Sequence, residues 1–200
     1  MLVLDAGNSL FSGSRRDLNA ASGGRLMVAA MNQMGYDALA IGPKEIEAGL
    51  DLLRQRMGEA EFSFLSANLL VDGSPLADPY LVVDKGGIRV AVIGLTSPDV
   101  LSDEAVRVLD PIEASQEQVA LLREQADLVV VLSNLGPALE QELAEKVPQI
   151  DLIVGGGSYT SSGRVVWVGS VGAVRAGGLG EYLGFTEVRF DAEGKPSGYN

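Results

Sequence analysis

The sequence predicts an α/β fold, in which helices cover a central sheet. Short apolar runs alternate with segments of helical periodicity as far as residue 154, and this alternation is typical of sheets buried on both faces. Apolar residues make up 46% of the 200 residues and charged residues 21%, as in ordinary globular proteins. No repeat or low-complexity segment interrupts the pattern. We therefore expect a single domain over residues 1–200.

The first third of the chain is expected to alternate strands and helices. The predicted strands are residues 2–4, 38–41 and 62–67, and the predicted helices are residues 26–34 and 50–57. In the second helix Leu50, Leu53 and Met57 recur at helical spacing, and Gly35 is a typical residue just after the first. Each strand is followed by a short polar loop.

The rest of the chain begins with a predicted hairpin, residues 80–85 and 88–96 around Gly86-Gly87. Further predicted elements are a helix at 112–125, a strand at 128–133, a helix at 138–146 and a strand at 151–154. After Gly163 only strand-like runs remain, at 164–168, 173–176 and 182–190. We expect the hairpin and this β-rich end to form a second, more antiparallel sheet that packs against the first.

Composition excludes several classes of function. The chain has no cysteine and no histidine, so disulfides, thiolate metal sites and imidazole chemistry are all absent. A formal net charge of −12 argues against nucleic acid as a partner. No apolar run reaches the roughly 20 residues that span a bilayer, so we expect no membrane insertion. The N-terminus shows no signal peptide.

Ligand sites in open α/β sheets lie in the loops at the carboxyl ends of the strands. Five polar loops follow predicted strands, at residues 5–9, 42–47, 66–68, 133–136 and 155–160. Because parallel strands end at the same edge of a sheet, these loops are expected to converge. The sequence therefore predicts one site assembled from several loops.

These loops also resemble a known family. They read Asp5-Ala6-Gly7-Asn8, Gly42-Pro43-Lys44-Glu45, Ser66-Ala67-Asn68, Ser133-Asn134-Leu135-Gly136 and Gly155-Gly156-Gly157-Ser158-Tyr159-Thr160. In this order they are similar to the loops of the N-terminal catalytic domain of bacterial 5′-nucleotidases, which are calcineurin-like metallophosphoesterases. The resemblance runs from Leu2 to about Asp191. It implies a four-layer α/β/β/α sandwich with mixed sheets and a phosphoric ester hydrolase that uses two metal ions.

The chain departs from the family pattern at the metal site. By this resemblance, Asn8 stands for the metal-bridging aspartate, Pro43 for a ligating asparagine, Lys44 for the catalytic histidine, Asn134 for a histidine, and Gly157 and Tyr159 for two more histidines. The family's opening strand, with its Asp-x-His pair, and its C-terminal nucleotide-binding domain have no counterpart in this sequence. The glycines and apolar strands around these positions remain.

Divalent transition ions need anionic or imidazole ligands in fixed geometry. Neutral amides such as Asn8 and Asn134 are poor ligands, Pro43 offers no side-chain donor, and the Lys44 ammonium repels a cation. We therefore predict no metal, no cofactor and no catalytic residue. The expected function is that of a degenerate 5′-nucleotidase-like domain without hydrolase activity, retained for binding or scaffolding.

Two alternatives remain open. One is a weak metal-dependent phosphohydrolase with carboxylate and amide ligands for Mg²⁺ or Mn²⁺. The other is a module that binds a small anion through Lys44, Gly156, Gly157 and Ser158. We favour simpler interpretations, in which Lys44 is solvated, Asp5 braces its own loop and Tyr159 fills the former metal cavity. A protein partner is not named by the sequence, and the family resemblance suggests a periplasmic or extracellular location.

Overall fold

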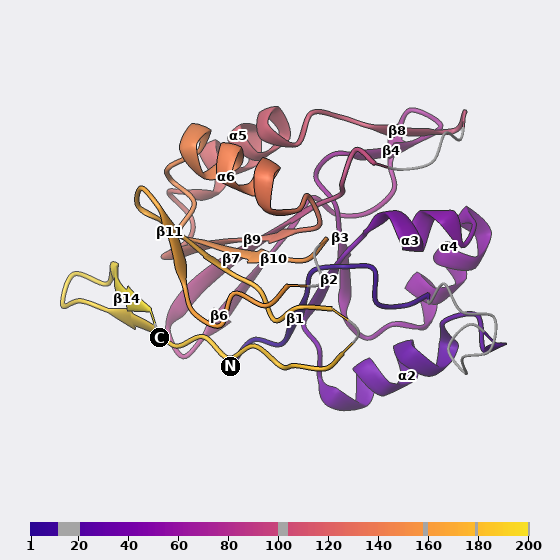
Figure 1. Ribbon diagram of the computed structural model, residues 1–200, viewed down its shortest axis with the longest axis horizontal. Helices are drawn as coiled ribbons and strands as arrows, with labels where there is room; N and C mark the ends of the chain where they lie inside the picture. The colour runs from indigo at the N-terminus through magenta and orange to yellow at the C-terminus, as the bar shows by residue number, and fades with distance from the viewer. Residues whose placement is uncertain (12–20, 100–103, 158–159, 179, 200) are drawn as a thin grey trace.

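The computed structural model describes residues 1–11, 21–99, 104–157, 160–178 and 180–199. Within these residues the strands form four sheets, of which two are stacked and carry helices on their outer faces (Figure 1). The helices are α2 (Arg25–Met34), α3 (Pro43–Glu47), α4 (Leu50–Glu59), α5 (Pro111–Leu122) and α6 (Pro137–Lys146). None of the helices in the described part of the chain has the length and apolar character needed to cross a bilayer.

The smaller stacked sheet is parallel and comes from the N-terminal third. Its order is β1 (Leu4–Asp5), β2 (Ala38–Ala40) and β3 (Ser63–Leu65). Helices α2, α3 and α4 cover its outer face, where Met31 and Leu53 pack in one buried cluster with Leu39 of β2. Gly35 ends α2 with a left-handed φ of 70°, as the sequence predicts.

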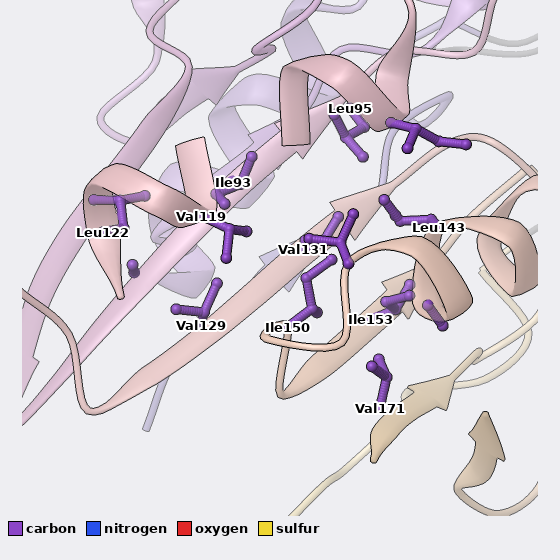
Figure 2. Close-up of a cluster of buried hydrophobic side chains, with 14 of the residues drawn as sticks. Ile93, Leu95, Val119, Leu122, Val129, Val131, Leu143, Ile150, Ile153 and Val171 are labelled. Carbon is purple, nitrogen blue, oxygen red and sulfur yellow. The ribbon is translucent and has the colours of Figure 1, made fainter. Parts of the chain in front are cut away.

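The larger sheet has six strands in the order β11-β12-β10-β9-β7-β6. These strands are β6 (Tyr80–Lys85), β7 (Ile88–Leu95), β9 (Leu128–Ser133), β10 (Leu152–Gly155), β11 (Val166–Val168) and β12 (Val171–Val174). The four inner strands are parallel, and β6 and β11 are antiparallel edge strands. Helices α5 and α6 pack on one face, with Leu122 and Leu143 in the same cluster as Val131 (Figure 2).

The second face of the larger sheet packs against the smaller one. Ala40 and Leu65 from the small sheet share a buried cluster with Val92 and Val130 from the large one. The two sheets approach each other closely at Gly94, because a Cβ there would lie 2.4 Å from the carbonyl oxygen of Leu65. The two sheets therefore touch near the carboxyl ends of β3 and β7.

Two small sheets complete the structure. One has the order β5 (Ser74–Pro75), β4 (Leu69–Val71) and β8 (Val106–Val108), and the other is the hairpin of β13 (Val188–Phe190) and β14 (Pro196–Tyr199). The rings of Trp167 and Tyr199 meet edge to face, with centroids 5.2 Å apart. This contact joins the C-terminal hairpin to the edge strand β11.

The prediction of a mixed α/β fold is confirmed, and the 80–85/88–96 hairpin forms as β6 and β7. The expected second sheet is found: the six-stranded sheet holds the hairpin and β11–β12, packs against the smaller sheet, and has antiparallel pairs that the smaller sheet lacks. The prediction did not place β9 and β10 in this sheet, and β13–β14 lie outside it; β7 itself pairs in parallel with β9. The run Val90-Ala91-Val92-Ile93 explains this: it is buried throughout and so occupies an interior parallel position. Of the predicted strand 182–190, only Val188–Phe190 is a strand.

Candidate functional site

Loops from both stacked sheets meet at the carboxyl ends of their parallel strands. The loops after β1, β2, β9 and β10, together with the segment after β7, surround a small open cavity of about 150 Å³. Its lining residues are Asn8, Pro43, Ser97, Asp99, Asn134, Leu135 and Gly157. We call this the amide cavity, after the two asparagines at its base.

The two asparagines are hydrogen-bonded to each other. Asn8 Nδ2 donates to Asn134 Oδ1 over 3.0 Å. The remaining contacts are to backbone: Lys44 N–H donates to Asn8 Oδ1 (2.9 Å), and Asn134 Nδ2 donates to the carbonyl of Ala6 (2.7 Å). Asn8 has a φ of 65°, a left-handed conformation that asparagine tolerates better than most residues. The pair therefore joins the loops after β1, β2 and β9.

Glu45 lies fully buried in α3 and holds two of these loops from within. Its Oε2 accepts the N–H groups of Asn8 (2.8 Å) and Gly42 (2.9 Å), and its Oε1 accepts that of Leu10 (3.1 Å). Burial raises the pKa of Glu45 to about 7, although the three N–H donors favour the carboxylate, and the nearby charge of Asp5 raises it further. Glu45 therefore has a structural role, because it holds the loop backbone through these three hydrogen bonds.

Asp5 braces the loop that follows β1. Its Oδ1 accepts the N–H of Gly7 (2.8 Å) and the hydroxyl of Ser9 (2.6 Å), an arrangement that confirms the predicted bracing role. Burial raises the pKa of Asp5 despite these two hydrogen bonds. Both buried carboxylates in the region therefore direct oxygens at N–H and O–H groups of the loops themselves.

A second buried network lies behind the cavity. Thr96 Oγ1 donates to the carbonyl of Ile41 (2.8 Å), and it lies 2.7 Å from Ser66 Oγ. Asn68 completes the network, since its Oδ1 accepts Thr96 N–H and its Nδ2 donates to Thr96 O, both at 2.9 Å. The Ser66-Ala67-Asn68 loop thus binds the end of β7 to the small sheet and does not line the cavity.

The glycine-rich loop after β10 approaches the others closely. Gly156 N–H donates to the carbonyl of Ser133 over 2.6 Å, and a Cβ at Gly156 would lie 2.7 Å from Ala6 O. Gly157 has a φ of 65°, and a Cβ there would lie 2.9 Å from Asn134 O. Only glycine allows this contact without displacement of backbone. Ser158 and Tyr159, which the sequence also places here, are outside the described residues.

Comparison with known proteins places this arrangement among the phosphoesterases. The chain is 31% identical over 201 residues to the snake venom 5′-nucleotidase of Gloydius brevicauda, covering 86% of the chain and 34% of that protein. It is 29% identical over 238 residues to the trifunctional nucleotide phosphoesterase protein YfkN of Bacillus subtilis, covering 96% and 16%. The solved structure of the 5′-nucleotidase precursor from Thermus thermophilus covers the whole chain with a TM-score of 0.87 at 33% identity, and the chain covers 44% of it.

Over most of its length, the chain is homologous to 5′-nucleotidases and calcineurin-like phosphoesterases. No protein-family model matches it. The chain spans about a third of the length of the 5′-nucleotidase from Gloydius brevicauda, and a smaller share of YfkN.

The structure brings together four of the positions that the family resemblance assigns to the metal site. Asn8, Pro43, Asn134 and Gly157 all line the amide cavity. Lys44 and Gly156 adjoin it through their backbones but are not among its lining residues. In the described part of the chain, the Lys44 ammonium forms no ion pair.

Sequence reasoning missed Ser97 and Asp99 in the cavity wall. Both come directly after the apolar run of β7. The other loops of the site were identified by this same pattern, a polar segment after an apolar strand. The assignment of this run to a hairpin left the segment after it out of the converging loops. As an inner parallel strand of the large sheet, β7 instead ends at the same edge as β9 and β10.

Proposed function

We propose that this chain is a degenerate 5′-nucleotidase-like phosphoesterase domain that does not hydrolyse phosphate esters and is retained for binding or scaffolding. The observation that carries the proposal is the hydrogen bond between Asn8 and Asn134. By resemblance, these positions belong to a metal-bridging aspartate and a metal-ligating histidine. Two neutral amides now bond to each other and to backbone groups, and they supply no charge to hold a metal ion.

The remaining donors do not fit a pair of metal ions either. Of the nearby carboxylates, Asp5 and Glu45 already accept N–H and O–H groups of the loops, and Asp99 is a single exposed carboxylate on the cavity wall. Pro43 has no donor atom, and Lys44 places a cation in the adjacent helix. Within the described ranges, no three His, Cys, Asp or Glu side chains are grouped so as to hold a metal. A two-metal phosphoesterase needs such ligands to activate water and to neutralise charge on the phosphate.

The order in which the helices and sheets pack supports a scaffold that is kept although the catalytic residues are not. Helices α2–α4, the small sheet, the large sheet and helices α5–α6 follow one another through three buried clusters. We take this order to be the four-layer α/β/β/α sandwich that the family resemblance implies. A scaffold kept while its ligands change is expected to serve recognition or assembly.

The test combines metal content with turnover. The purified chain is dialysed, analysed for bound metals, and assayed with p-nitrophenyl phosphate, bis-p-nitrophenyl phosphate and AMP in the presence of Mg²⁺, Mn²⁺ or Zn²⁺. We expect no stoichiometric metal and no hydrolysis above the protein-free control.

Metal-dependent turnover would contradict the proposal and favour the weak phosphohydrolase. Asn8→Ala and Asn134→Ala would then have to abolish that turnover, whereas Thr186→Ala, a half-buried change outside the cavity, would have to keep it. Turnover that survives both asparagine changes would point to a contaminating phosphatase.

A further inference from the structure

The polar groups that line the amide cavity suit a ligand other than phosphate. We propose that it binds a primary ammonium group, carried by an alkyl chain, in preference to a phosphate. This inference rests on the proposed function, because it assigns a ligand class to a site that we take to bind without hydrolysis. Two features of the cavity support it, its acceptors and the engagement of backbone donors around it.

The acceptors come from two loops. Asp99 is exposed and is the only charged residue among the described lining residues. Its Oδ2 accepts the Ser97 hydroxyl (3.3 Å) and its N–H donates to Ser97 Oγ (3.2 Å), so the short turn orients the carboxylate. Asn134 Oδ1 accepts a single N–H, from Asn8, and an amide oxygen has a second lone pair. A primary ammonium has three N–H donors, and these acceptors match them in kind.

Four backbone donors around the cavity are already engaged. The N–H groups of Asn8 and Gly42 bind Glu45, and the N–H of Gly156 binds Ser133 O. Leu135 N–H binds the Ser133 hydroxyl. A backbone nest for an anion requires such groups to be free. Asp5 and Glu45 also lie nearby, but burial raises the pKa of both carboxyls, so the negative charge at the cavity is that of Asp99, with Lys44 as the neighbouring cation.

The size and the walls of the cavity limit what can enter. Its volume of about 150 Å³ is below the roughly 300–1,000 Å³ of common small-molecule pockets, so it suits one side-chain-sized group and not a nucleotide. Leu135 and Pro43 provide apolar wall for an alkyl stem. The net charge of −12 favours the approach of cations from solution.

An alkylammonium could come from a free amine or from a lysine side chain of a partner protein. The test titrates the ¹⁵N-labelled chain with cadaverine, with N-acetyl-lysine methylamide and with inorganic phosphate, using 1,5-pentanediol as the uncharged control. The side-chain amide signals of Asn8 and Asn134 report directly on the cavity. We expect saturable shifts of these signals with one or both amines and none with the diol or phosphate.

Asp99→Asn should weaken amine binding at least tenfold, whereas Asp51→Asn, which removes an exposed carboxylate from α4, should leave it unchanged. A response to cadaverine alone would identify a free amine as the ligand, and a response to the lysine derivative alone would identify a protein side chain. The proposal is overturned if phosphate moves the asparagine signals, if no amine does so saturably, or if Asp51→Asn weakens binding as much as Asp99→Asn. Metal-dependent turnover in the separate phosphatase assay would instead refute the proposed function, so the two failures are distinguishable.

Discussion

Asn8 and Asn134 are 126 residues apart in sequence, yet their side-chain amides are hydrogen-bonded at 3.0 Å. One amide belongs to the small sheet and the other to the large sheet, so the bond joins the two halves of the fold at their functional edge. Asn134 is almost completely buried and also donates to Ala6 O. This pair is a structural link, and the proposed loss of the metal site rests on it.

Asn134→Ala should destabilise the fold by about 1–3 kcal/mol, because it leaves Ala6 O and Asn8 Nδ2 without partners. Urea denaturation measures the change. A double-mutant cycle with Asn8→Ala isolates the pair, and we expect a coupling free energy of about 1 kcal/mol. Strict additivity of the two single changes would show that the bond does not form in solution.

The buried Glu45 makes stability depend on pH. Its pKa is raised from 4.5 to about 7, so between these values the folded chain retains a proton that the unfolded chain has released. Raising the pH through this window therefore destabilises the fold, by up to about 3 kcal/mol for this group. Asp5, whose pKa burial also raises, acts in the same direction.

Urea midpoints measured from pH 5 to pH 8 test this prediction. The midpoint should fall as pH rises, and Glu45→Gln should flatten the profile. Glu47→Gln, an exposed change in the same helix, serves as the control and should leave the slope unaltered. A profile equally steep in Glu45→Gln would assign the effect to other groups.

Gly94 tests the contact between the stacked sheets, and Gly58 serves as the control. Gly94→Ala places a Cβ within 2.5 Å of Leu65 backbone atoms, so it should cost about 1–3 kcal/mol or more. Gly58→Ala, in the exposed face of α4 with nothing within 4 Å, should instead stabilise by about 0.5–1 kcal/mol. Opposite shifts in Tm are expected, and a harmless Gly94→Ala would contradict the close approach.

Thr96 tests the network behind the cavity. Thr96→Val keeps the shape but removes the donor to Ile41 O and the partner of Ser66 Oγ, and we expect a loss of about 1–3 kcal/mol. Thr186→Val lies outside this network and should change stability by less than about 0.5 kcal/mol. Thermal unfolding of the two variants side by side gives the comparison, and equal effects would argue that the hydroxyl is not engaged.

Local patterns predicted helices α2, α4, α5 and α6, the β6–β7 hairpin and the meeting of several loops at one edge. They missed the short helix α3, and they did not show that β9 and β10 lie in the same sheet as the hairpin, because strand pairing is decided by long-range packing. Val92 illustrates this: a buried apolar run fits either an inner parallel strand or a sandwich strand, and only its neighbours β6 and β9 decide.

The site was predictable only in part, for the same reason. Loop motifs identified Asn8 and Asn134, but nothing local indicates that their amides face each other. Tyr182, Leu183 and Phe185 suggested a strand from their composition, yet all three are largely exposed outside any sheet. The composition of a segment shows only a preference for strand, and tertiary contacts decide whether the strand forms.

The most direct test of the altered site is an anomalous difference map from crystals soaked in MnCl₂. We expect no anomalous peak within ligand distance of Asn8, Pro43, Asn134 or Gly157, and electron density that keeps the two asparagine amides in contact. A pair of well-coordinated manganese ions between these residues, with the amides separated, would contradict the account.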